Sequence, residues 1–397
     1  MFEKIIKQLI SNNSTPAYIF DEAKLRTRVA MVREILNEDA DIKLCYAMKA
    51  NPFLLKCLEG LVEKFEVCSP GELAICKKSN IDMKRVVFSG VNKEYTDVYR
   101  AFEYGVEIFT VESWKHLSVI EQCAAQQQKK VKVIIRLSAD NQFGVDRNTI
   151  YRMAESRGQF GNVQMCGIHF YSGTQKKITK IVDELNQLAE FCCELKEKYM
   201  MEIEHLEYGP GLLVDYFAKG EDETAILQDF AKVIRDVSKQ FPLTIEMGRF
   251  LTADCGSYVT KVIDTKQTNG QQYCIVDGGI NHVNYYGQVM GVRIPPVRFY
   301  QQDGEAYSEK ELETKIDKNA GICVCGSLCT VADVLVRSMP LKEVKEGDIF
   351  VFDKIGAYSV TEGMYLFLSR RLPKVYLYKD GSLELLRDSY ETYEWNC

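Results

Sequence analysis

The first two thirds of the chain alternate between short apolar runs and longer segments of mixed polarity. Strands that are buried on both faces show such nearly continuous apolar runs. We therefore predict eight strands, at residues 42–48, 65–69, 86–89, 108–111, 131–137, 164–170, 204–208 and 243–247. Amphipathic segments between them predict helices, among them 94–104, 113–127, 147–157, 176–200 and 221–240. This alternation indicates the α/β class and a (β/α)8 TIM barrel.

The pattern changes after about residue 255, where strand-like runs follow one another with little helix between them. Such a pattern is typical of an antiparallel β domain, built as a barrel or a sandwich. Helices are expected there only at 308–318 and 330–337, and the early run at 16–20 is expected to add a strand. Since 397 residues exceed what one hydrophobic core usually fills, we predict two domains: residues 25–255, and residues 1–24 plus 256–397.

Composition narrows the class of partner and the compartment. With 50 basic and 56 acidic residues the net charge is −6, which argues against nucleic acid or an anionic membrane as the main partner. No run approaches the roughly 18 apolar residues of a membrane span. We expect the opening MFEKIIKQLISNN to form a short amphipathic helix interrupted by charge, and not a signal peptide. We therefore expect a cytoplasmic protein with fourteen reduced cysteines.

The cysteines closest in sequence are Cys323, Cys325 and Cys329. No histidine lies near them in the sequence, and a structural zinc site needs four well-spaced ligands. We therefore predict no metal site.

Candidate chemistry lies at the ends of the predicted barrel strands, because barrel enzymes place catalytic groups there. Lys49 ends the first strand, where a lysine beyond a buried run can act as a nucleophilic amine. By position alone, a solvated lysine is the simpler interpretation. The seventh strand runs into Gly209-Pro210-Gly211, which could bring backbone N–H groups to a phosphate or make an ordinary tight turn.

Two further strand ends carry polar side chains. The eighth strand ends with Glu246 and Arg249, which suit either a rim salt bridge or the binding of a phosphate by the guanidinium. The sixth strand runs into a turn that carries His169, Tyr171 and Thr174. A single histidine in such a turn is more often structural than catalytic.

Seven segments together resemble the fold-type III pyridoxal-phosphate decarboxylases, which include diaminopimelate, ornithine and arginine decarboxylases. In order along the chain they are YAMKAN (46–51), FEVCSPGEL (65–73), GIHFYSGTQ (167–175), YGPGL (208–212), EMGRFLTADCG (246–256), CGSLCTVADVL (325–335) and DKIGAY (353–358). The resemblance extends from residue 16 to about residue 378. It implies a barrel followed by a β domain, as the apolar pattern also predicts.

The resemblance implies roles for the barrel residues. Lys49 would carry pyridoxal 5'-phosphate as a Schiff base. Glu246 would pair with the pyridine nitrogen and keep it protonated, which makes the ring a strong electron sink. The other cofactor-binding residues implied by the resemblance are Tyr171, Thr174, Gly209, Gly211, Arg249 and Tyr358.

The resemblance also implies a second subunit. Cys329 matches the cysteine that the family delivers from the partner subunit to protonate the carbanion. We therefore expect a homodimer with two shared active sites.

Two departures from the family pattern concern the cofactor. Tyr171 stands where the family usually has a histidine stacked on the cofactor ring, and we infer that the tyrosine ring stacks there instead. The phosphate turn usually has three glycines, whereas Pro210 has no N–H to donate.

A third departure concerns the substrate, a small or carrier-bound amino acid. Thr330 stands where diaminopimelate decarboxylases have a glutamate that reads the distal amino group, and segment 277–286 lacks their arginine. Losing two charged groups argues against meso-diaminopimelate. A carrier-protein-tethered aminoacyl group, or a siderophore or antibiotic intermediate, fits better. Thr330, Asp333 and Tyr285 are candidate substrate residues.

Three alternatives stay open. An amino-acid racemase of the alanine-racemase type would place an arginine against the pyridine nitrogen, where Glu246 argues for decarboxylation. Cofactor carriers made of a barrel alone would lack the β domain. A non-catalytic family member would have lost cofactor residues that this chain retains.

Overall fold

The computed structural model describes residues 2–38, 40–288, 290–312 and 321–397. The chain divides into two compact units, each described here by itself. The barrel unit comprises Arg26–Val214 and Asp222–Leu251. The sheet unit comprises Met1–Leu25, Asp215–Glu221 and Thr252–Cys397. The sequence placed the boundaries at residues 25 and 255 and did not single out the segment Asp215–Glu221.

The barrel unit is built on eight parallel strands that close on themselves, with β2 paired to β9. The strands are β2 (Lys43–Ala47), β3 (Lys64–Val67), β4 (Val86–Phe88), β5 (Ile108–Val111), β6 (Val131–Arg136), β7 (Val163–Tyr171), β8 (His205–Gly209) and β9 (Leu243–Met247). All eight predicted strands and the TIM-barrel fold are confirmed.

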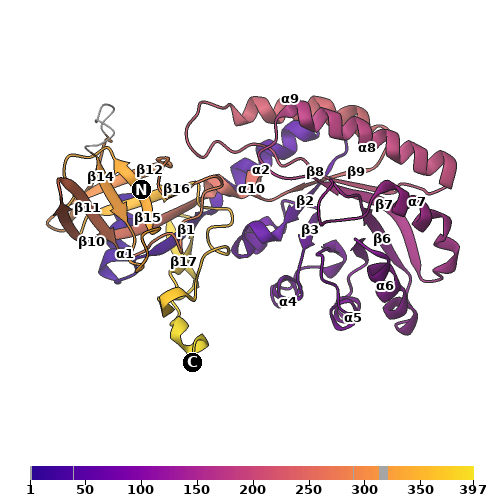
Figure 1. The fold of residues 1–397 in the computed structure, drawn as a ribbon, viewed down its shortest axis with the longest axis horizontal. Coiled ribbons are helices and arrows are strands. Elements are labelled where there is room, and N and C mark those ends of the chain that lie inside the picture. Colours follow the sequence, from indigo (N-terminus) through magenta and orange to yellow (C-terminus); the bar gives the residue numbers. More distant parts are fainter. Residues whose placement is uncertain (1, 39, 289, 313–320) are drawn as a thin grey trace. The chain divides into compact units, whose positions relative to one another are not determined.

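Helices surround the outside of these strands (Figure 1). They are α2 (Glu22–Leu36), α3 (Leu55–Leu58), α4 (Pro70–Lys78), α5 (Tyr95–Tyr104), α6 (Trp114–Gln126), α7 (Arg147–Glu155), α8 (Ile178–Tyr199), α9 (Glu223–Ser238) and α10 (Arg249–Thr252). Local sequence explains several starts, because Ser69, Ser113, Asp146 and Asp222 accept hydrogen bonds from backbone N–H groups of the first helical turn. The five helices predicted by residue range are all present.

The described residues of the sheet unit form a ten-stranded sheet. Its main path runs β13-β12-β16-β10-β1-β17-β18, and β11 joins β10 to β14, which pairs with β15. The strands are β1 (Ala17–Asp21), β10 (Gly256–Thr268), β11 (Gln271–Val276), β12 (Val297–Asp303), β13 (Ala306–Lys310), β14 (Ile322–Cys325), β15 (Val334–Met339), β16 (Ile349–Asp353), β17 (Lys374–Lys379) and β18 (Ser382–Arg387).

The hydrophobic core of the sheet unit explains why the N-terminal segment, α1 and β1, belongs to this unit. Helix α1 (Phe2–Ser11) buries Ile6 and Leu9 against β1, β10 and β16. Strand β1 lies between β10 and β17, so the prediction that residues 16–20 add a strand to this domain is confirmed.

Two expectations for the sheet unit are wrong. The sheet is mixed, because β1 pairs with β17 and β11 with β14 in parallel. The helix predicted at 330–337 is not present, because Val334–Met339 forms β15. Of the helix predicted at 308–318, residues 308–310 belong to β13, and residues 313–320 lie outside the described part. Residues 334–339 pair with β14 as an antiparallel strand. This pairing outweighs the local helical preference of the segment.

In the described part of the chain, no helix combines the length and the apolar character that a membrane crossing requires.

Candidate active site

Lys49 lies directly after strand β2, in a single 3-10 turn formed by Met48–Ala50. The next residues turn the chain sharply: Tyr46 Oη donates to the carbonyl of Asn51 at 2.9 Å, and Asn51 Oδ1 accepts from the N–H of Phe53 at 3.1 Å. The Lys49 side chain keeps 34% of its surface exposed. Its amine is therefore held at the carboxyl end of the barrel while remaining reachable.

Two buried carboxylates from the neighbouring strands receive this amine. Lys49 Nζ donates to Glu66 Oε2 at 2.7 Å and to Glu246 Oε1 at 3.0 Å. The barrel register explains the meeting, because Ala47 pairs with Glu66 on β3, and Cys45 pairs with Glu246 on β9. Parallel neighbours of β2 thus bring both side chains to the same rim.

His169 on β7 completes the cluster. Its Nε2 lies 3.0 Å from Glu246 Oε2, and the histidine is almost fully buried. Its Nδ1 has no hydrogen-bond partner among the described residues. Which ring nitrogen of His169 carries the proton depends on these contacts. His169 therefore holds the second oxygen of Glu246, while Lys49 holds the first.

The two carboxylates differ in charge. Burial and the nearby Glu246 raise the pKa of Glu66. Burial opposes ionisation of Glu246 as well, but Lys49 and His169 outweigh it and lower the pKa of Glu246 well below its usual range. The cluster thus keeps Glu246 anionic, and Glu66 is the carboxyl that takes up a proton first.

Glu66, His169 and Glu246 also lie close enough together to be considered for a metal ion, with their ligand atoms within 4.8 Å of one another. The Lys49 ammonium already contacts both carboxylates. A protein amine is therefore the cation around which this cluster is organised.

The turns after β7 and β8 approach each other closely. A Cβ on Gly209 would lie 2.6 Å from Tyr171 Cδ2, so the tyrosine ring occupies the space beside this glycine. Gly211 has a φ of +56°, and a Cβ there would lie 2.0 Å from the carbonyl oxygen of Gly173 and 2.9 Å from Thr174 Cα. Both positions exclude a larger residue. The structure thus brings Tyr171, Thr174, Gly209 and Gly211 together.

Tyr171 lies beside the amine cluster as well. Lys49 Nζ is 5.9 Å from the centroid of its ring. Burial raises the pKa of Tyr171, and the positive charges of Lys49 and Arg249 oppose that rise. Arg249 is half-buried and begins α10, the short helix after β9. One rim therefore carries an amine, a flat neutral ring, two glycine-lined turns and a guanidinium.

A buried lysine that the sequence analysis did not single out ties the two turns together. Lys176 Nζ donates to the carbonyl of Gly209 at 3.2 Å and to Ser172 Oγ at 3.1 Å. Glu184 Oε2 on α8 accepts from the same ammonium at 2.6 Å. The backbone N–H of Lys176 also donates to the carbonyl of Gly211 at 3.0 Å. This residue fixes the spacing of the two turns.

In the sheet unit, Cys329 and Thr330 lie on the loop between β14 and β15, with Cys329 exposed and Thr330 half-buried. Asp333 on the same loop is only 3% exposed. Its carboxylate accepts from the N–H groups of Ile280 and Leu328, at 2.8 and 2.7 Å. These bonds favour a role for Asp333 in holding the loop that carries Cys329, over direct contact with a substrate.

The two sheet-unit tyrosines differ in environment. Tyr285 is buried, packs against the rings of Tyr216 and Phe217, and donates its hydroxyl to the carbonyl of Asp353 at 2.5 Å. These contacts favour a packing role. Tyr358 is half-buried and has a φ of +68°, a conformation that bulky residues rarely adopt. Such backbone strain is concentrated at functional sites.

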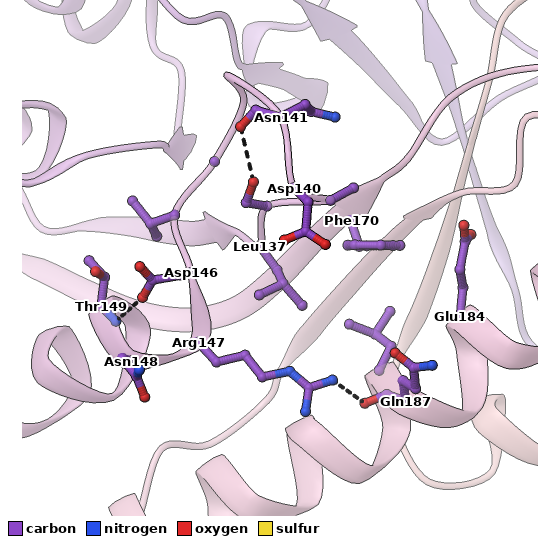
Figure 2. A pocket seen from close by; sticks show the side chains of 15 residues that line it. Leu137, Asp140, Asn141, Asp146, Arg147, Asn148, Thr149, Phe170, Glu184 and Gln187 are labelled. Carbon is purple, nitrogen blue, oxygen red and sulfur yellow. Dashed lines mark hydrogen bonds between the residues drawn. The ribbon is translucent and has the colours of Figure 1, made fainter.

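A cavity of about 840 Å³ lies elsewhere on the barrel unit, under the loop that follows β6 (Figure 2). Phe170 lines it, and this ring stacks on Tyr208 at 6.4 Å on the opposite side of β7 from the inward-facing His169. Among the described residues that line this cavity, none is a residue predicted from the strand ends. It is separate from the Lys49 cluster.

Sequence reasoning missed Glu66 as a member of the cluster. The available signal was a carboxylate inside the apolar run FEV, in a segment already noted for its resemblance. His169 was interpreted as structural, and the structure places it against Glu246.

The model of the family described as "Pyridoxal-dependent decarboxylase, pyridoxal binding domain" matches residues 22–253, more than half of the chain. The chain belongs to this family. It is therefore an enzyme, a carboxy-lyase that uses pyridoxal 5'-phosphate to decarboxylate an amino acid or an amino-acid derivative. The Lys49 cluster fits this cofactor, because an amine, an anionic carboxylate and a flat ring stand on one rim.

Individual relatives vary in substrate. L-glutamyl-[BtrI acyl-carrier protein] decarboxylase of Niallia circulans is 28% identical, over 96% of this chain and 93% of its own. A 2-[(L-alanin-3-ylcarbamoyl)methyl]-2-hydroxybutanedioate decarboxylase of Staphylococcus aureus is 25% identical, over 94% and 97%. Diaminopimelate decarboxylases of several bacteria match at 24% to 26% identity.

The fold is shared with solved structures. Diaminopimelate decarboxylase from Helicobacter pylori complexed with L-lysine superposes with a TM-score of 0.82, at 23% identity over 98% of each chain. At that identity the likeness shows the fold, a TIM barrel with an added sheet domain.

Proposed function

We propose that Lys49 holds the cofactor aldehyde and that Glu246 accepts a hydrogen bond from the pyridine nitrogen. The observation that carries this proposal is the Lys49 amine, half-exposed between Glu66 and an anionic Glu246 at the barrel rim. Bound pyridoxal phosphate supplies an electron sink for the electron pair that remains when CO2 departs. Glu246 favours that chemistry because its negative charge stabilises a protonated pyridine nitrogen.

The rest of the rim would hold the cofactor in place. Tyr171 would stack on one face of the pyridine ring, as an aromatic side chain can. The phosphate would bind at the turns after β7 and β8, on backbone N–H groups near Gly209 and Gly211, with Thr174 beside them. Since Pro210 has no N–H, more of the phosphate binding would depend on the Arg249 guanidinium. Tyr358 would add a hydroxyl to the phosphate.

Cys329 would protonate the carbon from which CO2 has left. Its thiol is exposed on a loop that Asp333 holds by two backbone hydrogen bonds. An exposed, well-held thiol suits delivery to a second copy of the chain. We therefore propose a homodimer with two shared active sites.

Exposed apolar side chains of the sheet unit support that dimer. Val331, two residues after Cys329, is 91% exposed, and other large apolar side chains are also exposed in this unit: Met364, Leu366, Phe367, Leu368, Tyr393 and Trp395. Large exposed apolar patches mark interaction surfaces. We place this homodimer in the cytoplasm, in a biosynthetic step of amino-acid metabolism.

The substrate would be an amino-acid derivative other than free meso-diaminopimelate. Thr330 offers a neutral hydroxyl where a glutamate would read a distal amino group. Asp333 and Tyr285 are both buried in contacts within the sheet unit. The two relatives named for a carrier-bound glutamyl group and for a hydroxybutanedioate derivative support a larger or carrier-tethered substrate. A buried site built for one polar tail discriminates strongly against another.

A CO2-release screen tests the substrate proposal. Purified protein loaded with pyridoxal phosphate would be offered free meso-diaminopimelate, free L-glutamate, glutamyl-carrier protein and a carboxylate-rich aminoacyl conjugate. We expect release from the carrier-bound or conjugated substrates and little from the free amino acids. Lys49→Ala protein is the control for cofactor chemistry in solution. Rapid release from free meso-diaminopimelate would overturn the substrate proposal and leave the cofactor assignment intact.

A further inference from the structure

Two cysteines that the proposed function does not use lie unusually close together in the sheet unit. Cys323 Sγ and Cys325 Sγ are 3.6 Å apart on strand β14. Two residues of a strand span roughly 6.6 Å of chain, so neighbouring side chains on one face are normally further apart. A disulfide bond is about 2.05 Å long, and a small movement of either side chain would bring the sulfurs to that distance.

The irregular pairing of β14 accounts for the approach. The register between β14 and β15 shifts between Ile322 and Val324 and again between Val324 and Cys325. Irregularities of this kind increase the local twist of a strand and re-aim its side chains. On the other side, β14 pairs with β11 in regular parallel register. The two thiols therefore lie where the pairing of β14 with β15 is irregular.

The two thiols differ in acidity in the way that a reactive pair requires. The hydrogen bond from Cys325 lowers the pKa of Cys323 to about 7, and the Arg337 guanidinium acts in the same direction. The same interaction raises the pKa of Cys325. Cys323 thus supplies the thiolate, and Cys325 is the thiol beside it. A low-pKa thiol beside a second cysteine suits reversible oxidation by a small hydroperoxide. Cys323 keeps 8% of its surface exposed, and Cys325 beside it is half-buried, so the pair is reached from the Cys325 side.

We propose that Cys323 and Cys325 form a reversible disulfide within β14 when the protein meets a hydroperoxide. The Cys323 thiolate attacks one peroxide oxygen, which breaks the O–O bond, gives a sulfenic acid and releases hydroxide. The Cys325 sulfur then attacks the Cys323 sulfur, and the sulfenic oxygen leaves as water with the thiol proton. In sum, two thiols and hydrogen peroxide become one disulfide and two water molecules, and a dithiol reductant reverses the change.

The position of the pair gives its oxidation a consequence. Strand β14 ends at Cys325, and the loop that carries Cys329 follows it directly. The N–H of Gly326 donates to the carbonyl of Asp333 at 3.1 Å, and Asp333 also holds Leu328. A disulfide between Cys323 and Cys325 would shift the backbone next to Gly326, the first residue of this loop. The site is therefore placed to change the presentation of Cys329 without involving that thiol.

Peptide mass spectrometry of the full-length protein tests the proposal without an activity assay. The protein would be treated with a few equivalents of hydrogen peroxide, denatured, and its free thiols blocked with N-ethylmaleimide. Trypsin releases residues 319–337 as one peptide that contains all three thiols of this region, Cys323, Cys325 and Cys329. We expect this peptide to lose two hydrogens and to carry a single block, at Cys329, and to carry three blocks after reduction.

Matched variants locate the bridge. Cys325→Ser should abolish the bridged peptide and leave Cys323 to over-oxidise, whereas Cys274→Ser, which removes the buried thiol on neighbouring β11, should leave the bridge in place. A wild-type peptide with three blocked thiols after peroxide treatment, or a bridge that includes Cys329, overturns the proposal. The wild-type measurement decides even if a variant does not fold. Because no step involves decarboxylation, the outcome is independent of the proposed function.

Discussion

The barrel unit and the sheet unit hold their predicted site residues in different ways. In the barrel unit, side chains from β3, β7 and β9 and the Lys49 side chain from the turn after β2 form one hydrogen-bonded cluster. In the sheet unit, Cys329 is exposed, while Asp333 and Tyr285 are buried in contacts with their own unit. Parallel strands deliver their carboxyl ends to one rim, so strand-end residues must converge. The loops of a mixed sheet are not brought to one edge in this way. Residues on such loops therefore need the surface of another unit or subunit to complete a site.

The largest effect should come from removing the amine at the centre of the barrel cluster. Lys49→Ala should lower decarboxylation by about 10³-fold or more, because it removes the amine that would form the Schiff base with the cofactor. Visible absorbance of the lysine-bound cofactor should vanish in the same protein. The matched control is Lys56→Ala, an exposed lysine paired with Glu59. Visible absorbance that persisted in Lys49→Ala would show that another residue carries the cofactor.

The two carboxylates of the barrel cluster should respond unequally. Glu246→Gln should lower kcat by about 10²-fold, because it removes the charge that supports a protonated pyridine nitrogen. Glu66→Gln should cost less than about tenfold, because the pKa of Glu66 is raised and a neutral amide resembles its protonated form. Steady-state kinetics on cofactor-loaded proteins measures both. Equal losses would mean that the two carboxylates share one role.

The sheet unit should affect activity because Cys329 of one chain would protonate the substrate carbon bound by a second chain. Cys329→Ala should lower the rate of correct protonation by about 10- to 100-fold, since general acids contribute on that scale. Mixing Lys49→Ala chains with Cys329→Ala chains should then restore activity, up to about a quarter of the wild-type value for random dimers with one intact site in each mixed dimer. Mixed chains that stay inactive would argue that each site is built from one chain.

The smallest predicted effect concerns the stability of the sheet unit against acid. Burial lowers the pKa of His282 to about 3, and its Nδ1 lies 2.8 Å from Tyr258 Oη. The unfolded chain, with a pKa near 6.5 for this histidine, binds a proton more readily than the folded chain. The contribution of neutral His282 is therefore complete above about pH 6.5 and decreases as the pH falls, by about 2 kcal/mol at about pH 5.

Denaturant unfolding at several pH values checks this prediction. His282→Asn should be less stable than the wild type at neutral pH, because a packed ring is lost, but its stability should depend less on pH between 7 and 5. Burial also lowers the pKa of His116 in the barrel unit, to about 4. The matching substitution of His116 therefore serves as the comparison for His282→Asn. Parallel pH profiles of the wild type and His282→Asn would show that His282 is not responsible for the acid sensitivity.

Much of the barrel unit could be predicted from the sequence alone. Apolar runs with a polar residue at the end mark buried parallel strands, and the eight runs indicated the closed barrel and the rim that carries Lys49, Glu246 and Arg249. The segments shared with the decarboxylases added the cofactor. This information is local, because each strand and its end residue are adjacent in the chain.

What only the tertiary structure decided depends on contacts between distant segments. Residues 334–339 form a strand and not a helix because β14 offers them a partner. Glu66 joins the cluster because β3 lies beside β2 in the closed barrel. Lys176 supports the turns because α8 presents Glu184 to its ammonium. A sequence records which residues can bury, pair or ionise, whereas the choice among partners is made by the free energy of the whole packed arrangement.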